Sequence, residues 1–196
     1  SDAKVGGDNF TGSLIVGHET TGTLNNAQYN TGVGLATLDV ITTGDYNTAI
    51  GFSSLSANTT GTRNLAIGHG AHDAADTESD NLAIGYDALG GSIAGGEYNV
   101  AIGNYSLDAN TSGDNNVGIG YEALSANTTG IRNTATGYRA LLLNTSGDYN
   151  IAFGTLALRH NTTGTRNLGI GIGAYDAADT ESDNLAIGYD ALGGSI

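Results

Sequence analysis

Apolar and small residues recur along this chain with a regular spacing of 17 residues. A short apolar run ends in a glycine eleven times, and nine of the ten intervals between these glycines are 17 residues long. The interval from Gly85 to Gly103 is 18 residues. The glycines are Gly17, Gly34, Gly51, Gly68, Gly85, Gly103, Gly120, Gly137, Gly154, Gly171 and Gly188. A period of this length predicts a stack of small repeated units in place of a globular core.

All the apolar runs but the first, which begins with Ser13, begin with asparagine and have the form Asn-x-small-large-Gly, of which residues 64–68 are an example. Alternation along a strand places the second and fourth residues on one face and the third on the other. The fourth residue is mostly Ile or Val, which favour strands, whereas the third is Ala or Gly in every unit after Ile15. The pattern predicts a strand of about five residues per unit, and the asparagine column predicts a ladder of stacked side-chain amides.

The residues that follow each glycine predict a second strand. Residues 85–89 have the sequence Gly-Tyr-Asp-Ala-Leu, and similar segments follow Gly120, Gly137 and Gly188. Turns of the form Asn-Thr-Thr-Gly complete many units, because Asn and Thr bond to nearby backbone and Gly supplies a positive φ. No segment keeps the 3.6-residue period of a helix. Two short strands in each unit therefore predict a flattened coil.

These patterns predict an all-β solenoid in which each coil bonds to the coils above and below it. Residues 1–12 are expected to form a lead-in or partial coil, and residues 13–196 a repeat domain of eleven coils, about 50 Å long. We expect the isoleucine and leucine columns to be buried along the whole length. Neither end has a sequence typical of a cap and the last coil is cut short, so we expect the natural protein to continue.

A longer duplication is superimposed on the short repeat. Residues 57–93 recur as residues 160–196, and 33 of these 37 positions are identical. The differing pairs are Ala57 and His160, Ala66 and Gly169, His69 and Ile172, and His72 and Tyr175. Duplication of this kind lengthens a rod, whereas an active site seldom needs two copies.

Composition and motifs narrow the possible functions. The formal net charge is −14 with only six Lys and Arg residues, which disfavours nucleic acid as a partner. No apolar run approaches the roughly 18 residues of a membrane span, so no membrane insertion of this segment is expected. The chain has no cysteine and none of the nucleophile-elbow, phosphate-loop or zinc-protease motifs. We therefore expect no enzyme and no cofactor.

Six acidic residues are the only candidate metal ligands in the sequence. They occur as two copies of one cluster, in which a glutamate replaces the turn glycine of other units. Oxygen ligands at this spacing could hold Ca²⁺. The alternative is a solvated acidic bulge, which we prefer because charge runs usually lie at the surface and the spacing fits neither an EF-hand loop nor the Gly-Gly-x-Gly-x-Asp nonapeptide. The residues are Asp76, Glu78, Asp80, Asp179, Glu181 and Asp183.

The four histidines, His18, His69, His72 and His160, are not expected to bind metal or to catalyse a reaction. His69 and His72 lie three residues apart, and an extended strand would place them on opposite faces. Their counterparts in the second copy are Ile172 and Tyr175. Neither role would survive that change, since a metal or catalytic site depends on the imidazole nitrogens.

Four tyrosines share one position of the repeat. They are Tyr86, Tyr121, Tyr138 and Tyr189. A ladder of rings on a rod could stack on sugars or contact a receptor, because tyrosine is enriched at binding surfaces. The alternative is packing between neighbouring coils, which the regularity of the column favours.

The paired motifs Asn-x-Ala-Ile-Gly and Tyr-x-Ala-Leu resemble the head repeats of trimeric autotransporter adhesins of the YadA type. They are also similar to the repeat shafts of phage tail fibres and related bacterial fibre proteins. The resemblance covers about residues 13–196, with eleven units in register. It implies a left-handed parallel β-roll in which three chains form a homotrimer, located outside the cell on a bacterial surface or on a phage virion. The implied partner is a cell-surface glycan or a protein receptor.

The function predicted is that of a structural and adhesive fibre segment, which displays a receptor-binding surface on a rigid trimeric rod. Both faces of the first strand are apolar, so a single chain would expose one of them as a stripe and tend to associate. An ice-binding solenoid is the alternative, based on a threonine column that includes Thr59, Thr111 and Thr128. A carbohydrate-processing β-helix is less favoured, because such enzymes use longer coils with clustered acids and bases.

Overall fold

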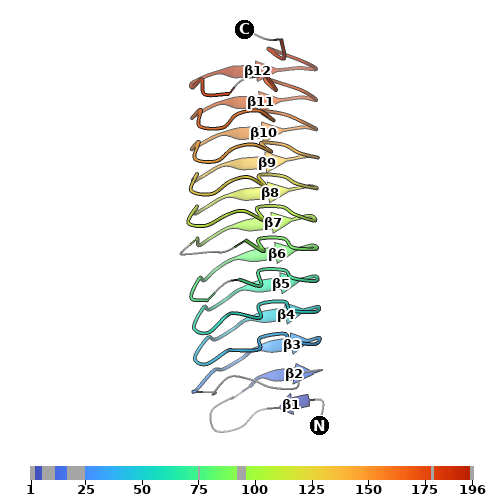
Figure 1. The fold of residues 1–196 in the computed structure, drawn as a ribbon, viewed down its shortest axis with the longest axis vertical. Coiled ribbons are helices and arrows are strands. Elements are labelled where there is room, and N and C mark those ends of the chain that lie inside the picture. The colour runs from blue at the N-terminus through green and yellow to red at the C-terminus, as the bar shows by residue number, and fades with distance from the viewer. Residues whose placement is uncertain are drawn as a thin grey trace.

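The computed structural model describes residues 3–5, 12–16, 25–74, 76–91, 96–177 and 179–194. These residues form a β-solenoid, in which one strand from each coil contributes to a single sheet that runs the length of the molecule (Figure 1). No helix occurs in these ranges. The all-β solenoid with 17-residue coils that the repeat predicts is confirmed.

The sheet has twelve strands, each of three residues, in the order in which they occur along the chain. They are β1 (Ala3–Val5), β2 (Leu14–Val16), β3 (Thr31–Val33), β4 (Thr48–Ile50), β5 (Leu65–Ile67), β6 (Leu82–Ile84), β7 (Val100–Ile102), β8 (Val117–Ile119), β9 (Thr134–Thr136), β10 (Ile151–Phe153), β11 (Leu168–Ile170) and β12 (Leu185–Ile187).

Strands β2 to β12 pair in parallel, and equivalent residues of the repeat lie opposite each other. The register continues across the 18-residue interval, where Leu82 pairs with Val100. Strand β1 is different, because it runs antiparallel to β2 and pairs Lys4 with Ile15. Strand β1 therefore covers an edge of β2 that would otherwise present unpaired backbone groups, a feature that the repeat pattern did not predict.

The second strand predicted after each glycine is wrong for every such segment from Gly34 onward, because these segments are turns, and the segment after Gly17 lies outside the described residues. Two residues in each such segment adopt a left-handed backbone, as do Asp87 with φ 47° and Leu89 with φ 53°. A left-handed residue breaks the alternation that an extended strand requires. The segments still bond from coil to coil, since the Leu89 N–H donates to the Ser106 carbonyl at 2.9 Å.

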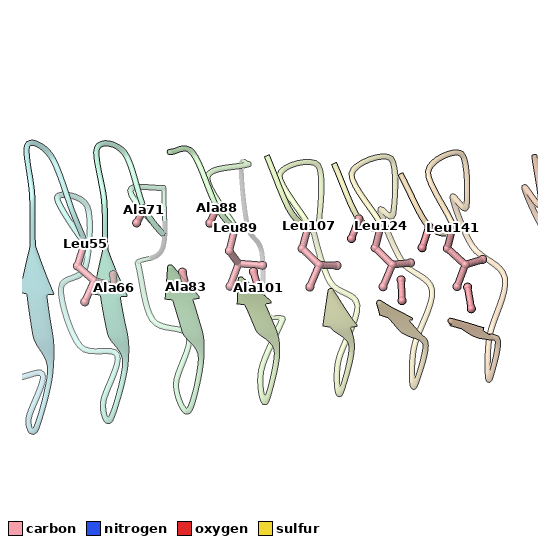
Figure 2. Close-up of a cluster of buried hydrophobic side chains, with 14 of the residues drawn as sticks. Leu55, Ala66, Ala71, Ala83, Ala88, Leu89, Ala101, Leu107, Leu124 and Leu141 are labelled. Carbon is pink, nitrogen blue, oxygen red and sulfur yellow. The ribbon is translucent and has the colours of Figure 1, made fainter. Parts of the chain in front are cut away.

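The interior of the solenoid is narrow. The middle residue of each strand from β2 to β12 is Ala or Gly, except for Ile15, and in most coils it packs inside the coil against a leucine from the opposite segment (Figure 2). The prediction that the leucine column is buried is confirmed for Leu38, Leu55, Leu89, Leu107, Leu124, Leu141 and Leu158. The prediction that the isoleucine column is buried is wrong. Those side chains point outward because a thin coil has room for only one large column.

An asparagine ladder runs through the interior and links every pair of neighbouring coils between Asn30 and Asn184. The backbone N–H of Asn47 donates to Oδ1 of Asn30 at 2.9 Å, and Asn47 in turn accepts from the N–H of Asn64 at 3.0 Å. The Nδ2 group of Asn47 donates to the Gly61 carbonyl at 2.8 Å. The asparagine column thus forms a ladder, as predicted, but these bonds join side-chain amides to backbone groups and not amide to amide. The ladder satisfies backbone groups that the coil buries.

The glycine that ends each strand is required by two constraints. Gly120 has φ 134°, a conformation that residues with a side chain rarely adopt. A Cβ atom on Gly120 would also overlap the carbonyl oxygen of Gly137 in the next coil. The same close approach recurs along the stack, so the 17-residue beat of glycines reflects direct contact between neighbouring backbones.

Candidate functional surfaces

The outer face of the sheet carries a long apolar surface. The first and third residues of each strand from β2 to β12 point outward, and Ile50, Ile119 and Phe153 are 39%, 36% and 58% exposed. Other exposed members are Leu14, Val16, Val33, Ile151, Ile170, Leu185 and Ile187. We call this surface the outer sheet face. The expectation that one apolar face of the strand would remain exposed on a single chain is confirmed.

Six aromatic rings form a continuous file along the turn that follows the strands. Consecutive ring centroids lie between 4.8 and 6.0 Å apart. In chain order the members of this ring file are Phe52, His69, Tyr86, Tyr105, Tyr121 and Tyr138. The fourth tyrosine of the predicted column, Tyr189, is 78% exposed and makes no ring contact within the described part of the chain.

The stacking limits what the ring file can offer to a ligand. Tyr121 and Tyr138 stack at 5.6 Å with planes 12° apart, so their faces cover each other. Their exposed parts are then ring edges and hydroxyl groups, which suit hydrogen bonding better than stacking on a sugar. The packing between coils that we preferred is confirmed for Tyr86, Tyr121 and Tyr138, while contact with a receptor stays a prediction.

Tyr105 belongs to the ring file although the sequence column did not reveal it. It follows Asn104, so it lies one position later than the other tyrosines relative to the strand glycine. Its ring meets Tyr86 and Tyr121 edge-on, with interplanar angles of 62° and 84°. A scan that also allowed the second position after the glycine would have found it.

The acidic cluster of the first copy is engaged within the protein. Glu78 is 3% exposed, and its Oε2 accepts the N–H groups of Asp76 and Thr77 at 2.8 and 3.0 Å. Both oxygens of Asp80 accept hydrogen bonds from the Arg63 guanidinium, each at 2.6 Å. This contact lowers the pKa of Asp80 below its usual value. The glutamate that replaces the turn glycine thus stabilises its own turn.

The second copy repeats these contacts. Glu181 accepts the N–H groups of Asp179 and Thr180, each at 3.1 Å, and Asp183 accepts two hydrogen bonds from Arg166 at 2.5 and 2.7 Å. In the ranges that the structure covers, no three histidine or acidic side chains are arranged to hold a metal ion. The carboxylates of Asp76 and Asp179 accept hydrogen bonds from the hydroxyls of Thr59 and Thr162. The six carboxylates thus bond to backbone, guanidinium or hydroxyl donors, and no calcium site is assigned.

The histidines do not converge. His69 belongs to the exposed ring file, whereas His72 lies inside the coil and is fully buried. The ring of His160 contacts the Asp176 carbonyl in the neighbouring coil. His18 lies outside the described residues. The structure therefore brings no two histidines into one site within those residues.

The threonine column directs its hydroxyl groups toward the protein. The hydroxyls of Thr42, Thr111 and Thr128 donate to backbone carbonyls of the next coil at 2.9, 2.8 and 3.0 Å. An ice-binding face requires an outward array of free hydroxyl groups. These intercoil bonds give the column a structural role.

The fold and these surfaces define the class of the protein as a parallel β-solenoid of short coils. No family model, curated protein or solved structure matches the chain. Within the residues that the structure describes, no helix is long and apolar enough to cross a membrane.

Proposed function

We propose that this chain is a structural and adhesive fibre segment, in which three copies associate through their outer sheet faces into a left-handed trimeric β-roll. The rod lies outside the cell, on a bacterial surface or a phage virion, and carries a surface that binds a glycan or protein receptor. The observation that carries the proposal is the outer sheet face itself, because it extends from β2 to β12.

The chemistry of this face supports association between copies. Its members are mostly large aliphatic and aromatic residues, although β9 contributes Thr134 and Thr136, and soluble monomers rarely expose an apolar patch of such extent. The face repeats with the coil spacing, so an identical chain in register offers a matching surface along the whole rod. A closed arrangement around a common axis buries this face on every copy equally.

A repeated rod also supports adhesion. Each coil presents the same kinds of side chain at the same position, so weak contacts to a repetitive receptor are multiplied along the rod and across copies. The edges and hydroxyl groups of the ring file are the contacts that we assign to this role, with Tyr86, Tyr121 and Tyr138 as central members. The role requires neither catalysis nor a cofactor.

The mass of the chain in solution tests the proposal. Light scattering should give the mass of three chains for the unchanged protein. Ile119→Asp places a carboxylate in the outer sheet face and should reduce the mass to one chain, because a buried unpaired charge is costly. Thr129→Asp adds the same charge to an exposed turn in the same region and should leave the trimer intact.

Circular dichroism of both variants checks that the coils remain folded. A folded, unchanged chain that has the mass of one or two copies at high concentration would contradict the proposed trimer. Retention of the trimer by a folded Ile119→Asp variant would show that the copies do not associate through this face.

A further inference from the structure

One polar ring occupies the apolar interior of the first copy. His72 stands in the column that otherwise holds buried leucines, between Leu55 and Leu89, and it is fully buried. The equivalent position of the second copy holds Tyr175, which is 1% exposed. The two near-identical copies therefore differ inside the coil at this site, with an ionisable imidazole in one and a phenol in the other.

The imidazole is poorly matched to its surroundings. Neither Nδ1 nor Nε2 of His72 has a hydrogen-bond partner in the protein. Nearby in the stack, Oδ1 of Asn58 is also buried without a partner. In other coils this oxygen accepts from the next asparagine of the column, as Asn110 does from Asn127 at 3.0 Å, but the next residue here is Ala75.

The groups around His72 offset only part of the effect that burial has on its pKa. Burial lowers the pKa of His72, and the smaller opposing effects of the Leu89 backbone and the negative charge of Glu78 leave it at about 4. The leucines before and after it in the column carry no charge. The carboxylate of Asp73, the next residue, is turned toward Gly70, where the Asp87 carboxylate also lies.

We propose that the coil around His72, residues 69–85, is an acid-sensitive joint in the rod. When a proton binds to His72, the imidazolium is a charge inside an apolar coil, so the coil opens and brings the ring to water. The hydrogen bonds that this coil makes to its two neighbours are then lost locally. The second copy lacks the joint, because the Tyr175 hydroxyl gains no charge on acidification.

The direction of the pH effect follows from the two states of the histidine. A histidine in an unfolded chain binds its proton near pH 6.5. In the closed coil, His72 binds a proton only at a much lower pH. The open form therefore binds more protons between these limits, and acidification favours opening. Each pH unit below about 6.5 shifts the equilibrium toward the open coil by up to tenfold.

Exchange of residues between the copies tests the joint. His72→Tyr gives the first copy the residue that the second copy already accommodates, and Tyr175→His installs the imidazole in a matching coil. Backbone amide exchange, corrected for intrinsic rates, is measured at about pH 7 and about pH 4.5. In the unchanged protein, protection should fall by up to about a hundredfold around Leu89 and persist around Tyr175.

Each variant has a defined outcome. His72→Tyr should keep its protection in acid, and Tyr175→His should lose protection in the second copy as well. The joint is refuted if His72→Tyr loses protection in acid as the unchanged protein does. It is equally refuted if the imidazole resonances of His72 in the native protein titrate at or above about pH 6.5. The resonance measurement needs no variant, so it decides the matter even if a substitution unfolds the chain.

Discussion

The side-chain oxygen of Asn116 accepts a hydrogen bond from the backbone N–H of Asn133, one coil later, at 2.9 Å. The Nδ2 group of Asn116 donates at 2.8 Å to the carbonyl of Gly130. Asn116 and Asn133 are fully buried, so water cannot replace either bond. One side chain thus joins two coils and satisfies two backbone groups, and the asparagine ladder acts as the polar spine of the rod.

Asn116→Ala should lower the free energy of unfolding by about 2–4 kcal/mol, because it leaves a buried N–H and a buried carbonyl without partners. Asn116→Ser should cost less, since Ser13 already supplies the equivalent bond to the N–H of Asn30 at 2.8 Å. Chemical denaturation measures both. Equal losses for the two variants would show that the bond to the N–H of Asn133 contributes little.

Gly120→Ala should destabilise the protein by more than about 3 kcal/mol, because a Cβ atom adds overlap with the Gly137 carbonyl to the strain of a positive φ. Gly188 is a matched control with φ 130°, whose Cβ atom would meet nothing closer than 3.8 Å. Gly188→Ala should therefore cost only the strain, about 1–2 kcal/mol. Similar losses in thermal or chemical unfolding would argue against close coil contact as the reason for glycine.

Asp108→Asn should stabilise the protein at neutral pH. Burial, together with the negative charges of the nearby Glu122 and Asp87 carboxylates, raises the pKa of Asp108 to about 6. Since the folded pKa lies above the unfolded value of about 3.9, the aspartate reduces stability as the pH rises through this window. Asp108 is only partly buried, so the gain is on the order of 1 kcal/mol.

The same variant should have little effect near pH 4, where Asp108 is protonated in the folded chain. Unfolding curves at about pH 4 and about pH 7.5 separate the two cases. A stabilisation of equal size at both pH values would mean that the charge of Asp108 is not its cause.

Tyr121→Ala should lower the thermal midpoint, because it removes ring contacts to Tyr105 and Tyr138. Tyr189→Ala removes a tyrosine of the same column that has no ring contact in the described structure, and it should leave the midpoint nearly unchanged. Differential scanning calorimetry compares the two. An equal decrease for both would indicate that the ring file does not stabilise the stack.

The repeat predicted the solenoid, the position of its strands, the buried leucine column and the asparagine ladder, because each depends on a residue type that recurs with the period. It failed at Leu89, whose left-handed backbone is unusual for leucine and leaves no signature in the sequence. Alternation along a strand separates its residues into two faces, but it does not show which face lies inside the coil. The small residues of one face, such as Ala83, are the signal in the sequence that identifies the face inside the narrow coil.

The sequence revealed only part of the candidate surfaces. The tyrosine column was visible, but Tyr105 departs from it by one position, and only the structure places its ring between Tyr86 and Tyr121. The exposed apolar stripe was foreseen from the two-sided character of the strand. The number of copies that cover this stripe depends on contacts between chains, which the repeat within one chain does not define.

The 18-residue interval shows where the solenoid accepts extra length. The pairing of Leu82 with Val100 is intact, and the Nδ2 group of Asn81 still reaches the Gly96 carbonyl at 3.0 Å, so the additional residue lies between Leu89 and Gly96. We expect a guest peptide inserted in this interval to leave the strands on either side in register. The fold thus offers a position at which a peptide can be inserted without changing the 17-residue spacing of the other coils.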